Sequence, residues 1–211
     1  MIKSKYTSAI TDKPWWLAGG IPAQSCIIAY QAVGASSQAA SYTNLANPGL
    51  YTAVPTSAPS WDNTAGFIFA NKNLDTNYTL PQTLNMAFIV RISDYNEAAS
   101  NHQWIIGGNN GSWGIRFRLN AATNVLFNGY QSDISATLGG VYAISRNMAF
   151  HNGRLLNTST FAGGVGGQNL ELGRLTDAGY NVYCNIQAVS VYAPGLTEQQ
   201  VLAVSNAMNA L

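Results

Sequence analysis

Short segments in which apolar and polar residues alternate recur along this chain of 211 residues. From Leu84 to Ser93, and again from Trp113 to Leu119, every second residue is apolar. A period of two is typical of a β-strand with one buried face. Gly- and Asn-rich turns separate these segments, so the sequence predicts an all-β, antiparallel sandwich or barrel. The other predicted strands are Cys26–Val33, Phe67–Ala70, Gln103–Ile106, Asn124–Asn128, Val141–His151, Asn169–Arg174 and Asn185–Ala193.

One short C-terminal helix is predicted. The run from Thr197 to Gln200 matches a capping box, in which an N-cap threonine and a glutamine three residues later bond each other's backbone. Val201, Val204 and Met208 then follow at helical spacing and form one apolar face. The segment Asn47–Ser60, rich in Pro and Ser, is expected to be an irregular crossing.

The chain is unusually poor in charge. Only 9% of its residues are charged and the formal net charge is +1, whereas about 25% is usual for soluble proteins. This excludes the strongly basic surface with which proteins bind nucleic acids or anionic membranes. The polar surface comes instead from 22 Asn, 17 Ser and 15 Thr, a composition that favours an extracellular or virion-surface protein.

The N-terminal residues have no apolar core of the kind found in a signal peptide. The uncharged stretch from Pro14 to Ser60 is interrupted too often by Gly, Pro and Gln to span a membrane. A virion-surface protein made in the host cytoplasm without a signal peptide would reconcile these features. A processed chain that has lost its signal is the alternative.

Four elements of the last third follow one another in a recognisable order. They are the strand–turn–strand Met148–Leu156, the strand Asn169–Gly173, the last strand Asn185–Tyr192 and the helix start Gly195–Val201. In this order and spacing they resemble the LamG-like branch of the concanavalin A-like lectin/glucanase superfamily. The resemblance implies a two-sheet jelly-roll sandwich over residues 25–211, with residues 1–24 as an N-terminal arm or capping segment. It also implies that the first and last strands pair near the middle of one sheet.

The two cysteines begin the first and last of these strands. If Cys26 and Cys184 start antiparallel partners, they lie at opposite ends of the pair. A disulfide needs Cα atoms within about 7 Å, so we predict two buried free thiols.

A block near the N-terminus carries a second resemblance. Its segments are Trp15–Ile21, Ala29–Gln31, Gly34–Ser36, Ser41–Gly49 and Ala58–Asp62. The block is similar to uncharacterised proteins encoded by tailed phages and phage-rich metagenomes. This resemblance implies a virion or phage-associated protein, and it supplies neither an activity nor binding residues.

No catalytic motif is present in the sequence. Glucanases of the superfamily use Glu-x-Asp-x-x-Glu to place two carboxylates on one strand face, and none of Glu97, Glu171 and Glu198 has Asp two residues later. His102 and His151 lack a Gly-x-Ser-x-Gly elbow or a plausible Cys partner. We therefore predict that the protein is not an enzyme.

No cofactor is expected, because Cys/His metal spacing is absent. Calcium stays open, since jelly rolls of this branch often hold it between rim loops through Asp carboxylates. The Asp residues here are isolated in sequence: Asp62, Asp75, Asp94, Asp133 and Asp177.

One loop has the chemistry of a glycan site. A sugar offers apolar C–H faces and a ring of hydroxyls, which suit aromatic rings beside amides and hydroxyls. The alternative is that the tryptophans are core residues at strand ends and that Asn-Gly is ordinary turn chemistry. The candidate glycan-binding residues are Trp104, Asn109, Asn110, Ser112, Trp113 and Tyr130.

Two further groups are candidates for contact with partners. An apolar N-terminal triplet either caps the end of the sandwich or docks on a neighbouring subunit. Arg91, Arg116 and Arg118 are expected on one sheet face, where they bind an acidic glycan or a partner or simply solubilise the face. The triplet consists of Trp15, Trp16 and Leu17.

These observations predict a phage virion surface protein: a capsid decoration, fibre or tail component that binds other virion proteins, forms a homo-oligomer and adheres to cell-surface glycans. The alternative is a carbohydrate-binding module that recognises cell-surface glycans outside a virion.

Overall fold

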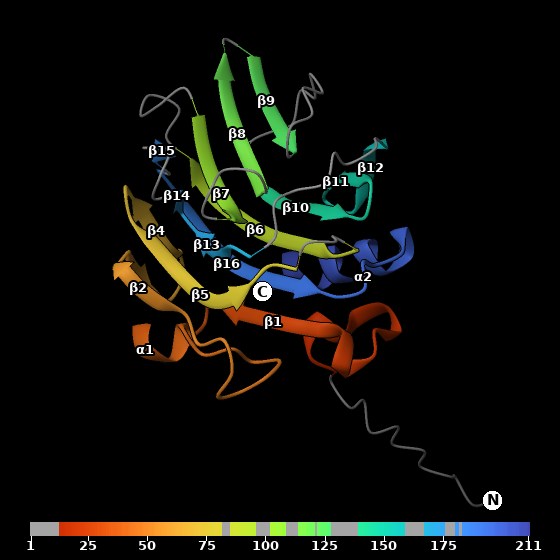
Figure 1. Ribbon diagram of the computed structural model, residues 1–211, viewed down its shortest axis with the longest axis horizontal. Coiled ribbons are helices and arrows are strands. Elements are labelled where there is room, and N and C mark those ends of the chain that lie inside the picture. The colour runs from red at the N-terminus through yellow and green to blue at the C-terminus, as the bar shows by residue number, and fades with distance from the viewer. Residues whose placement is uncertain are drawn as a thin grey trace, which may run out of the picture.

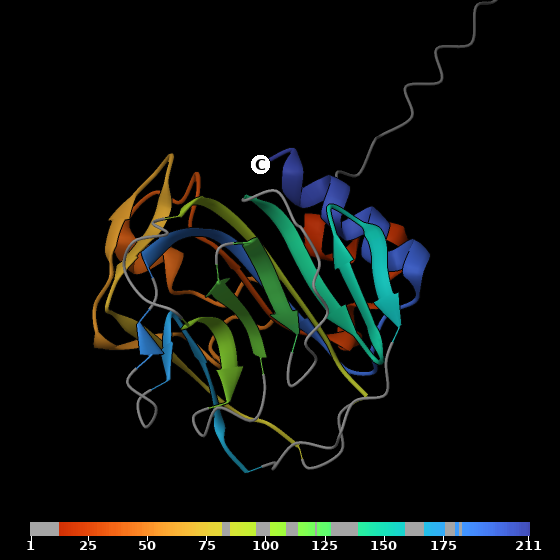
Figure 2. The same cartoon turned by 90° about the horizontal axis from the view of Figure 1, so that it is seen from above.

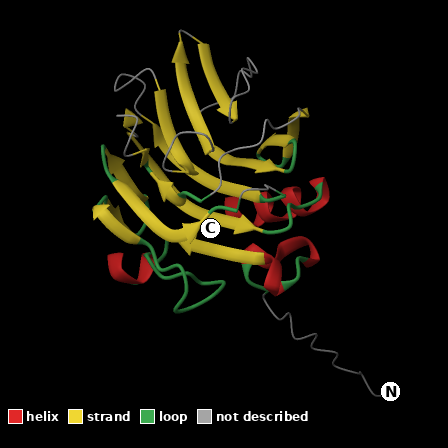
Figure 3. Ribbon diagram, viewed as in Figure 1, coloured by secondary structure: helices red, strands yellow, loops and turns green. Residues whose placement is uncertain are grey.

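The computed structural model describes residues 13–81, 85–95, 102–108, 114–120, 122–127, 139–158, 167–175, 180–181 and 183–211. Only the backbone is described at 95, 102–104, 114–120, 122–127, 174–175 and 180–181. Strands dominate this part of the chain and helices are few (Figure 3). The fold is an antiparallel, two-sheet jelly-roll sandwich with one short C-terminal helix, as predicted.

An eight-stranded sheet forms the first layer (Figure 1). Its strands run in the order β12-β11-β10-β6-β16-β4-β3, and β1 also pairs with β16. The strands are β1 (Cys26–Gln31), β3 (Ser60–Asp62), β4 (Gly66–Ala70), β6 (Ala87–Tyr95), β10 (Gly140–Ser145), β11 (Met148–His151), β12 (Arg154–Thr158) and β16 (Tyr183–Tyr192).

A six-stranded sheet forms the second layer, in the order β2-β5-β13-β7-β8-β9. A two-stranded ribbon pairs β14 (Arg174–Leu175) with β15 (Tyr180–Asn181). The strands of the second layer are β2 (Val54–Ser57), β5 (Asn73–Thr79), β7 (His102–Gly108), β8 (Gly114–Asn120), β9 (Ala122–Phe127) and β13 (Asn169–Leu172). The helices are the 3-10 helices η1 (Trp15–Gly20) and η2 (Ala23–Ser25), α1 (Gln38–Ser41) and α2 (Glu198–Asn209).

The last strand, β16, lies inside its sheet and is the partner of the first, as the resemblance implied. It pairs with β6 on one side, and on the other with β4 at one end and β1 at the other. Cys26 stands opposite Tyr192 and Cys184 opposite Phe69, so the cysteines lie at opposite ends of β16. Both are buried free thiols, which confirms the prediction.

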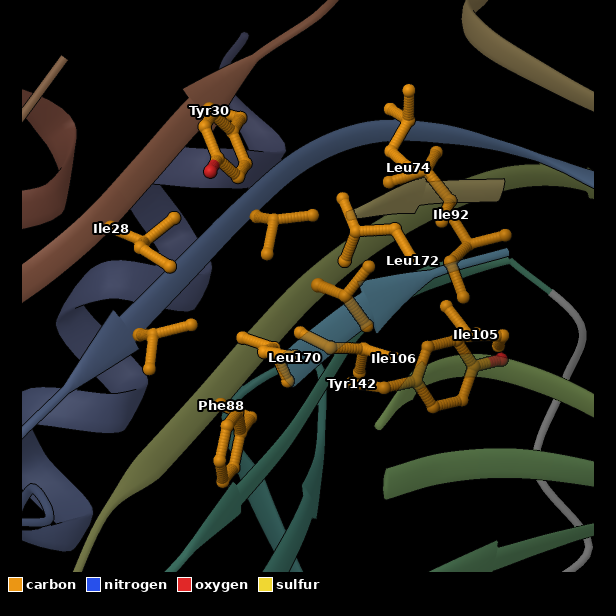
Figure 4. Close-up of a cluster of buried hydrophobic side chains, with 14 of the residues drawn as sticks. Ile28, Tyr30, Leu74, Phe88, Ile92, Ile105, Ile106, Tyr142, Leu170 and Leu172 are labelled. Carbon is orange, nitrogen blue, oxygen red and sulfur yellow. The ribbon is translucent and has the colours of Figure 1, made fainter. Parts of the chain in front are cut away.

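Both faces of the eight-stranded sheet are buried, and β6 shows why. Its alternation sends Phe88 and Val90 into the core between the sheets, whereas Ala87 and Ile89 face a second core. In Figure 4, residues from both sheets converge on the first core, among them Tyr30 of β1 and Leu172 of β13. The second core lies under α2 and η1, which form a third layer (Figure 2).

The C-terminal helix forms as its sequence predicts. Thr197 is the N-cap, and the capping box with Gln200 is present in both directions. Val201, Val204 and Met208 are all fully buried against the second core. Among the described residues, no helix has the length and hydropathy needed to cross a membrane.

Two asparagine side chains close the outer edge of β1. Asn44 is fully buried; its Oδ1 accepts from the Ala29 amide at 3.0 Å and its Nδ2 donates to the Ile27 carbonyl at 2.8 Å. The Asn47 Nδ2 donates to the carbonyls of Cys26 and Ile27, at 2.9 Å each. The loop backbone adds one bond, from the Leu45 amide to the Ala29 carbonyl. An open strand edge is a template for unwanted pairing, and these amides occupy it.

Three sequence predictions need correction. The predicted strand Val141–His151 is a hairpin, because Arg146 takes a left-handed φ of 55° and turns the chain between β10 and β11. The expected irregular crossing contains β2 and the first residue of β3. Arg91 does not share a sheet with Arg116 and Arg118, because β6 and β8 belong to different layers.

Candidate functional site

The predicted glycan loop lies almost wholly outside the described residues. Asn109, Asn110, Ser112, Trp113 and Tyr130 fall outside them, and of Trp104 only the backbone in β7 is described. Their role stays a prediction.

The N-terminal triplet covers the second core. Trp15 is buried, and its indole Nε1 donates to Gln31 Oε1 at 2.9 Å. Trp16 meets Trp15 edge-on, with ring centroids 5.4 Å apart, and its carbonyl accepts from the Tyr192 hydroxyl at 3.0 Å. Trp16 and Leu17 are half-buried. With these contacts the triplet caps the second core of its own chain. Docking of the exposed part of Trp16 and Leu17 on a neighbouring subunit stays a prediction.

His151 sits in a packed environment. Its ring stacks on Tyr142 with centroids 4.6 Å apart, and its Nε2 lies 3.0 Å from the Gly139 carbonyl oxygen. These contacts hold the residue beside the Asn152-Gly153 turn. For His102, in β7, the structure describes only the backbone.

The sequence did not predict the feature that stands out, a bulge in β5. Asn169 pairs with Thr79 and Glu171 with Asp75, so three residues of β5 oppose one residue of β13. Asn77 takes a left-handed φ of 56°, and its amide donates to Asp75 Oδ1 at 2.6 Å. Bulges of this kind turn side chains away from the regular pleat and are over-represented beside functional sites.

A chain of polar side chains crosses the bulge. The Thr79 hydroxyl donates to Asn169 Oδ1 at 3.1 Å, and Asn169 Nδ2 donates to Asp75 Oδ2 at 3.0 Å. Asn77 Nδ2 donates to the Thr52 carbonyl at 3.2 Å. Asn77 and Thr79 are exposed, and Asp75 and Asn169 are half-buried. These groups are fixed by one another and still reach the surface.

Two tyrosines join the polar chain. Tyr51 and Tyr78 are half-buried and meet edge to face, with centroids 5.1 Å apart. Burial, and secondarily Tyr51, raises the pKa of Tyr78. Tyr51 and Thr52 are neighbours in the chain, so the bond from Asn77 to Thr52 links the aromatic pair to the polar chain. We call the set Tyr51, Asp75, Asn77, Tyr78, Thr79 and Asn169 the bulge site.

The backbone of Tyr51 is strained. Its φ is 52°, a left-handed value that is uncommon for a bulky residue. The buried Tyr30 hydroxyl donates to its carbonyl and holds it there. Burial, and to a lesser degree the charge of Asp75, raises the pKa of Tyr30 well above its usual range, so this hydroxyl stays a donor. Strain that the surroundings maintain is often found at binding sites.

Two acidic residues pair across the strands at one end of the site. Glu171, which is 5% exposed, stands directly opposite Asp75. The next pair, Leu172 and Leu74, belongs to the core between the sheets. Because side chains alternate along a strand, the carboxylates lie on the outer face of the six-stranded sheet. These acids are far apart in sequence, and the pairing of β5 with β13 places them on adjacent strands.

In the described ranges, no group of three or more His, Cys, Asp or Glu side chains is arranged to hold a metal ion. What the bulge site offers is fixed hydrogen-bonding groups beside aromatic edges. That combination suits a ligand with hydroxyls and C–H faces.

The comparisons with known proteins identify the fold. No protein-family profile and no curated protein sequence matches the chain. Among solved structures it is similar to the Trypanosoma rangeli sialidase in complex with sialic acid (TM-score 0.61, 12% identity, 89% of this chain and 34% of that one). It is also similar to the binding domain of botulinum neurotoxin DC in complex with rat synaptotagmin II (TM-score 0.53, 15% identity, 89% of this chain and 52% of that one).

The chain thus spans about a third of the sialidase and about half of the toxin chain. At these identities the likeness shows the fold alone, a lectin-like β-sandwich. Neither neighbour transfers its activity to this chain.

Proposed function

We propose that this chain is a non-enzymatic attachment protein of a phage virion, serving as a capsid decoration, fibre or tail component. It holds other virion proteins through protein–protein contacts, and it adheres to cell-surface glycans through the bulge site. The observation that carries the adhesion is the joined set of Tyr51, Tyr78, Asp75, Asn77 and Asn169 on the surface of the six-stranded sheet.

The geometry favours a sugar for two reasons. Hydroxyls of a sugar need partners that are already oriented, and the mutual bonds of Asp75, Asn77 and Asn169 fix those partners before binding, which lowers the entropic cost. Tyr51 and Tyr78 add apolar edges for the C–H faces. Asn77 Oδ1 accepts no bond from the described residues, so it is available to a ligand hydroxyl.

The virion setting rests on the N-terminal block that resembles tailed-phage proteins and on a surface dominated by uncharged polar groups. The solved complex of the botulinum neurotoxin DC binding domain with synaptotagmin II is one case of protein recognition in a chain that contains this sandwich. We extend that capacity to binding between virion proteins.

A glycan array followed by calorimetry tests adhesion. Tyr78→Ala and Asn77→Ala should each weaken binding at least about fivefold. Asn206→Ala is the matched control. Asn206 is exposed on α2, and α2 covers the face of the eight-stranded sheet that points away from the six-stranded sheet and the bulge site. If no glycan binds above background, or if the control loses as much as Asn77→Ala, adhesion through this site is refuted.

Cryo-electron microscopy and mass spectrometry of purified particles test the virion role. We expect stoichiometric density for the chain, present as a homo-oligomer. Glycan binding by a chain that is missing from the particles would instead establish a carbohydrate-binding module outside a virion.

A further inference from the structure

We infer that two copies of this chain pair through their α2 helices in antiparallel orientation, so that Glu198 of each copy binds Arg91 of the other. The inference rests on the homo-oligomer proposed above, and it names the surface that joins the subunits.

Arg91 is a half-buried cation. It follows Ile89 of the second core on the same face of β6, and its cross-strand neighbours Val141 and Ala188 belong to that core. Among the described residues, the buried Arg91 Nη1 has no hydrogen-bond partner. Burial alone lowers the pKa of the guanidinium, so no acid of the described chain compensates its charge. A cation that has lost water without gaining an acid is unfavourable, and a carboxylate from a second copy would offset that cost.

The last turn of α2 lies beside Arg91. The amide of Val141, the cross-strand neighbour of Arg91, donates to Asn152 Oδ1 at 2.9 Å. Asn209, the last residue of α2, donates through Nδ2 to the same oxygen at 3.5 Å. Glu198 begins the helix, about 16 Å away along its axis. The cation and the acid therefore stand near opposite ends of one helix.

The outward row of α2 is almost uncharged. Its members are exposed and follow one another at helical spacing: Glu198, Leu202, Asn206 and Asn209. Glu198 is the only ionisable side chain of the helix, and Leu202 is 44% exposed. Amides and one leucine lose less on leaving water than charged side chains do, which suits a surface that a second copy covers.

A two-fold axis across α2 makes this row complementary to itself. A symmetric dimer brings the same patch of both copies together. With the axis between Leu202 and Asn206, the two Leu202 side chains pack on either side of it. Glu198 of each copy then comes to the last turn of the other copy's helix, where Arg91 stands. The carboxylate and the guanidinium can form a bidentate pair there, and the symmetry repeats this pair.

The surroundings of the helix agree with this arrangement. The Glu198 side chain is exposed and has no hydrogen-bond partner in the described ranges. Arg146, at the same end of the helix, donates instead through Nε to the Gly195 carbonyl at 3.2 Å. Trp16 and Leu17 of η1 are half-buried in the layer that α2 and η1 share, and they extend the apolar area (Figure 2).

Sedimentation velocity of the full chain tests the pairing. We expect a dimer, and Arg91→Glu and Glu198→Arg should each weaken it at least about tenfold, because each change places like charges at both contacts. Lys72→Glu is the matched control. It makes the same charge change as Arg91→Glu in the turn between β4 and β5, on the side of the sandwich away from α2 (Figures 1 and 2), and should leave the dimer unchanged. Circular dichroism establishes that each variant is folded.

Mixing the two weakened variants is the decisive step. In a mixed dimer, Glu at position 91 of one copy faces Arg at position 198 of the other, and the original Glu198 faces the original Arg91. Both contacts are then attractive. We therefore expect the two variants, each mainly monomeric alone, to form a one-to-one dimer when mixed, with one of them labelled by a fluorophore.

Each outcome decides the inference. A chain that stays monomeric at the highest concentration, or a dimer that neither Arg91→Glu nor Glu198→Arg weakens, overturns it. Variants that do not associate on mixing, or a control that weakens the dimer as much, overturn it as well. The virion role is tested separately by the purified particles, and adhesion by the glycan array, so neither falls with this interface.

Discussion

Replacing Asn44 by alanine should destabilise the protein more than the size of the change suggests. The side chain is fully buried, and its two ends satisfy both kinds of group on the outer edge of β1. After truncation, the amide of Ala29, itself fully buried, has no partner. An orphaned buried donor costs about 1–3 kcal/mol.

Further bonds disappear with the same side chain. Asn44 Nδ2 also donates to the Leu50 carbonyl at 3.1 Å, and Oδ1 also accepts from the Ala46 amide at 3.1 Å. Each such bond is worth about 0.5–1.5 kcal/mol. We therefore expect Asn44→Ala to lower the free energy of unfolding by about 3–5 kcal/mol, a large part of the 5–15 kcal/mol typical of a domain.

Asn47→Ala is the matched control. It removes bonds to the Cys26 and Ile27 carbonyls, but Ile27 keeps the bond from Asn44. Its expected cost is about 1–2 kcal/mol. Urea unfolding followed by tryptophan fluorescence measures both variants. The m-value, which is the slope of the free energy of unfolding against urea concentration, should not change. A loss below about 1 kcal/mol for Asn44→Ala, or losses that are equal for the two variants, would refute the claim that these amides close the strand edge.

Three further predictions concern the fold. Thr197→Ala removes the N-cap of α2 and should cost about 1 kcal/mol in urea unfolding; no change would mean that the capping box does not stabilise the helix. Gly66→Ala should cost well over about 1 kcal/mol, because φ is 84° and a Cβ would lie 2.5 Å from the Ile186 carbonyl oxygen. Gly49→Ala, where φ is 91° and nothing lies within 4 Å, isolates the backbone strain and should cost less. Burial raises the pKa of the Cys26 thiol from 9.0 to about 12. The unfolded thiol thus ionises first, and stability should fall as the pH rises from about 9 towards 12. Cys26→Ala should flatten this fall when unfolding is measured from pH 7 to 11, and an unchanged slope would contradict the assignment.

The alternating pattern predicts a strand where a face of that strand packs against a core. β6 illustrates this, since its two residue sets enter the two cores. The pattern failed at the turn between β10 and β11. The segment Ser145-Arg146-Asn147-Met148 has no Gly and Asn147 as its one typical turn residue, and the left-handed conformation is adopted by Arg146 instead of by Asn147.

The bulge site was missed for a different reason. β5 reads Asn-Leu-Asp-Thr-Asn-Tyr-Thr, and its inner positions are taken by Leu74, Thr76 and Tyr78. Because Thr76 is polar, the apolar alternation is too weak to mark a strand. The partners that complete the site are distant, as Asn169 lies 94 positions after Asp75. The one local signal was Asp75 two residues before Asn77, a spacing suited to a side-chain-to-backbone turn.

The N-terminal block, whose segments lie between Trp15 and Asp62, has a structural role, and this role limits what the block implies about ligands. Its segments meet at β1: Trp15 bonds Gln31, Asn44 bonds Ala29, and the Trp61 indole donates to the Ala32 carbonyl at 2.9 Å. The block therefore holds the first strand against the last one and covers its outer edge. Any chain that builds this sandwich around a β1–β16 pair can keep these residues whatever it binds. Differences in ligand preference between such chains must then come from other residues. The exposed polar and aromatic groups around the β5 bulge can change without disturbing the hydrogen bonds that hold β1.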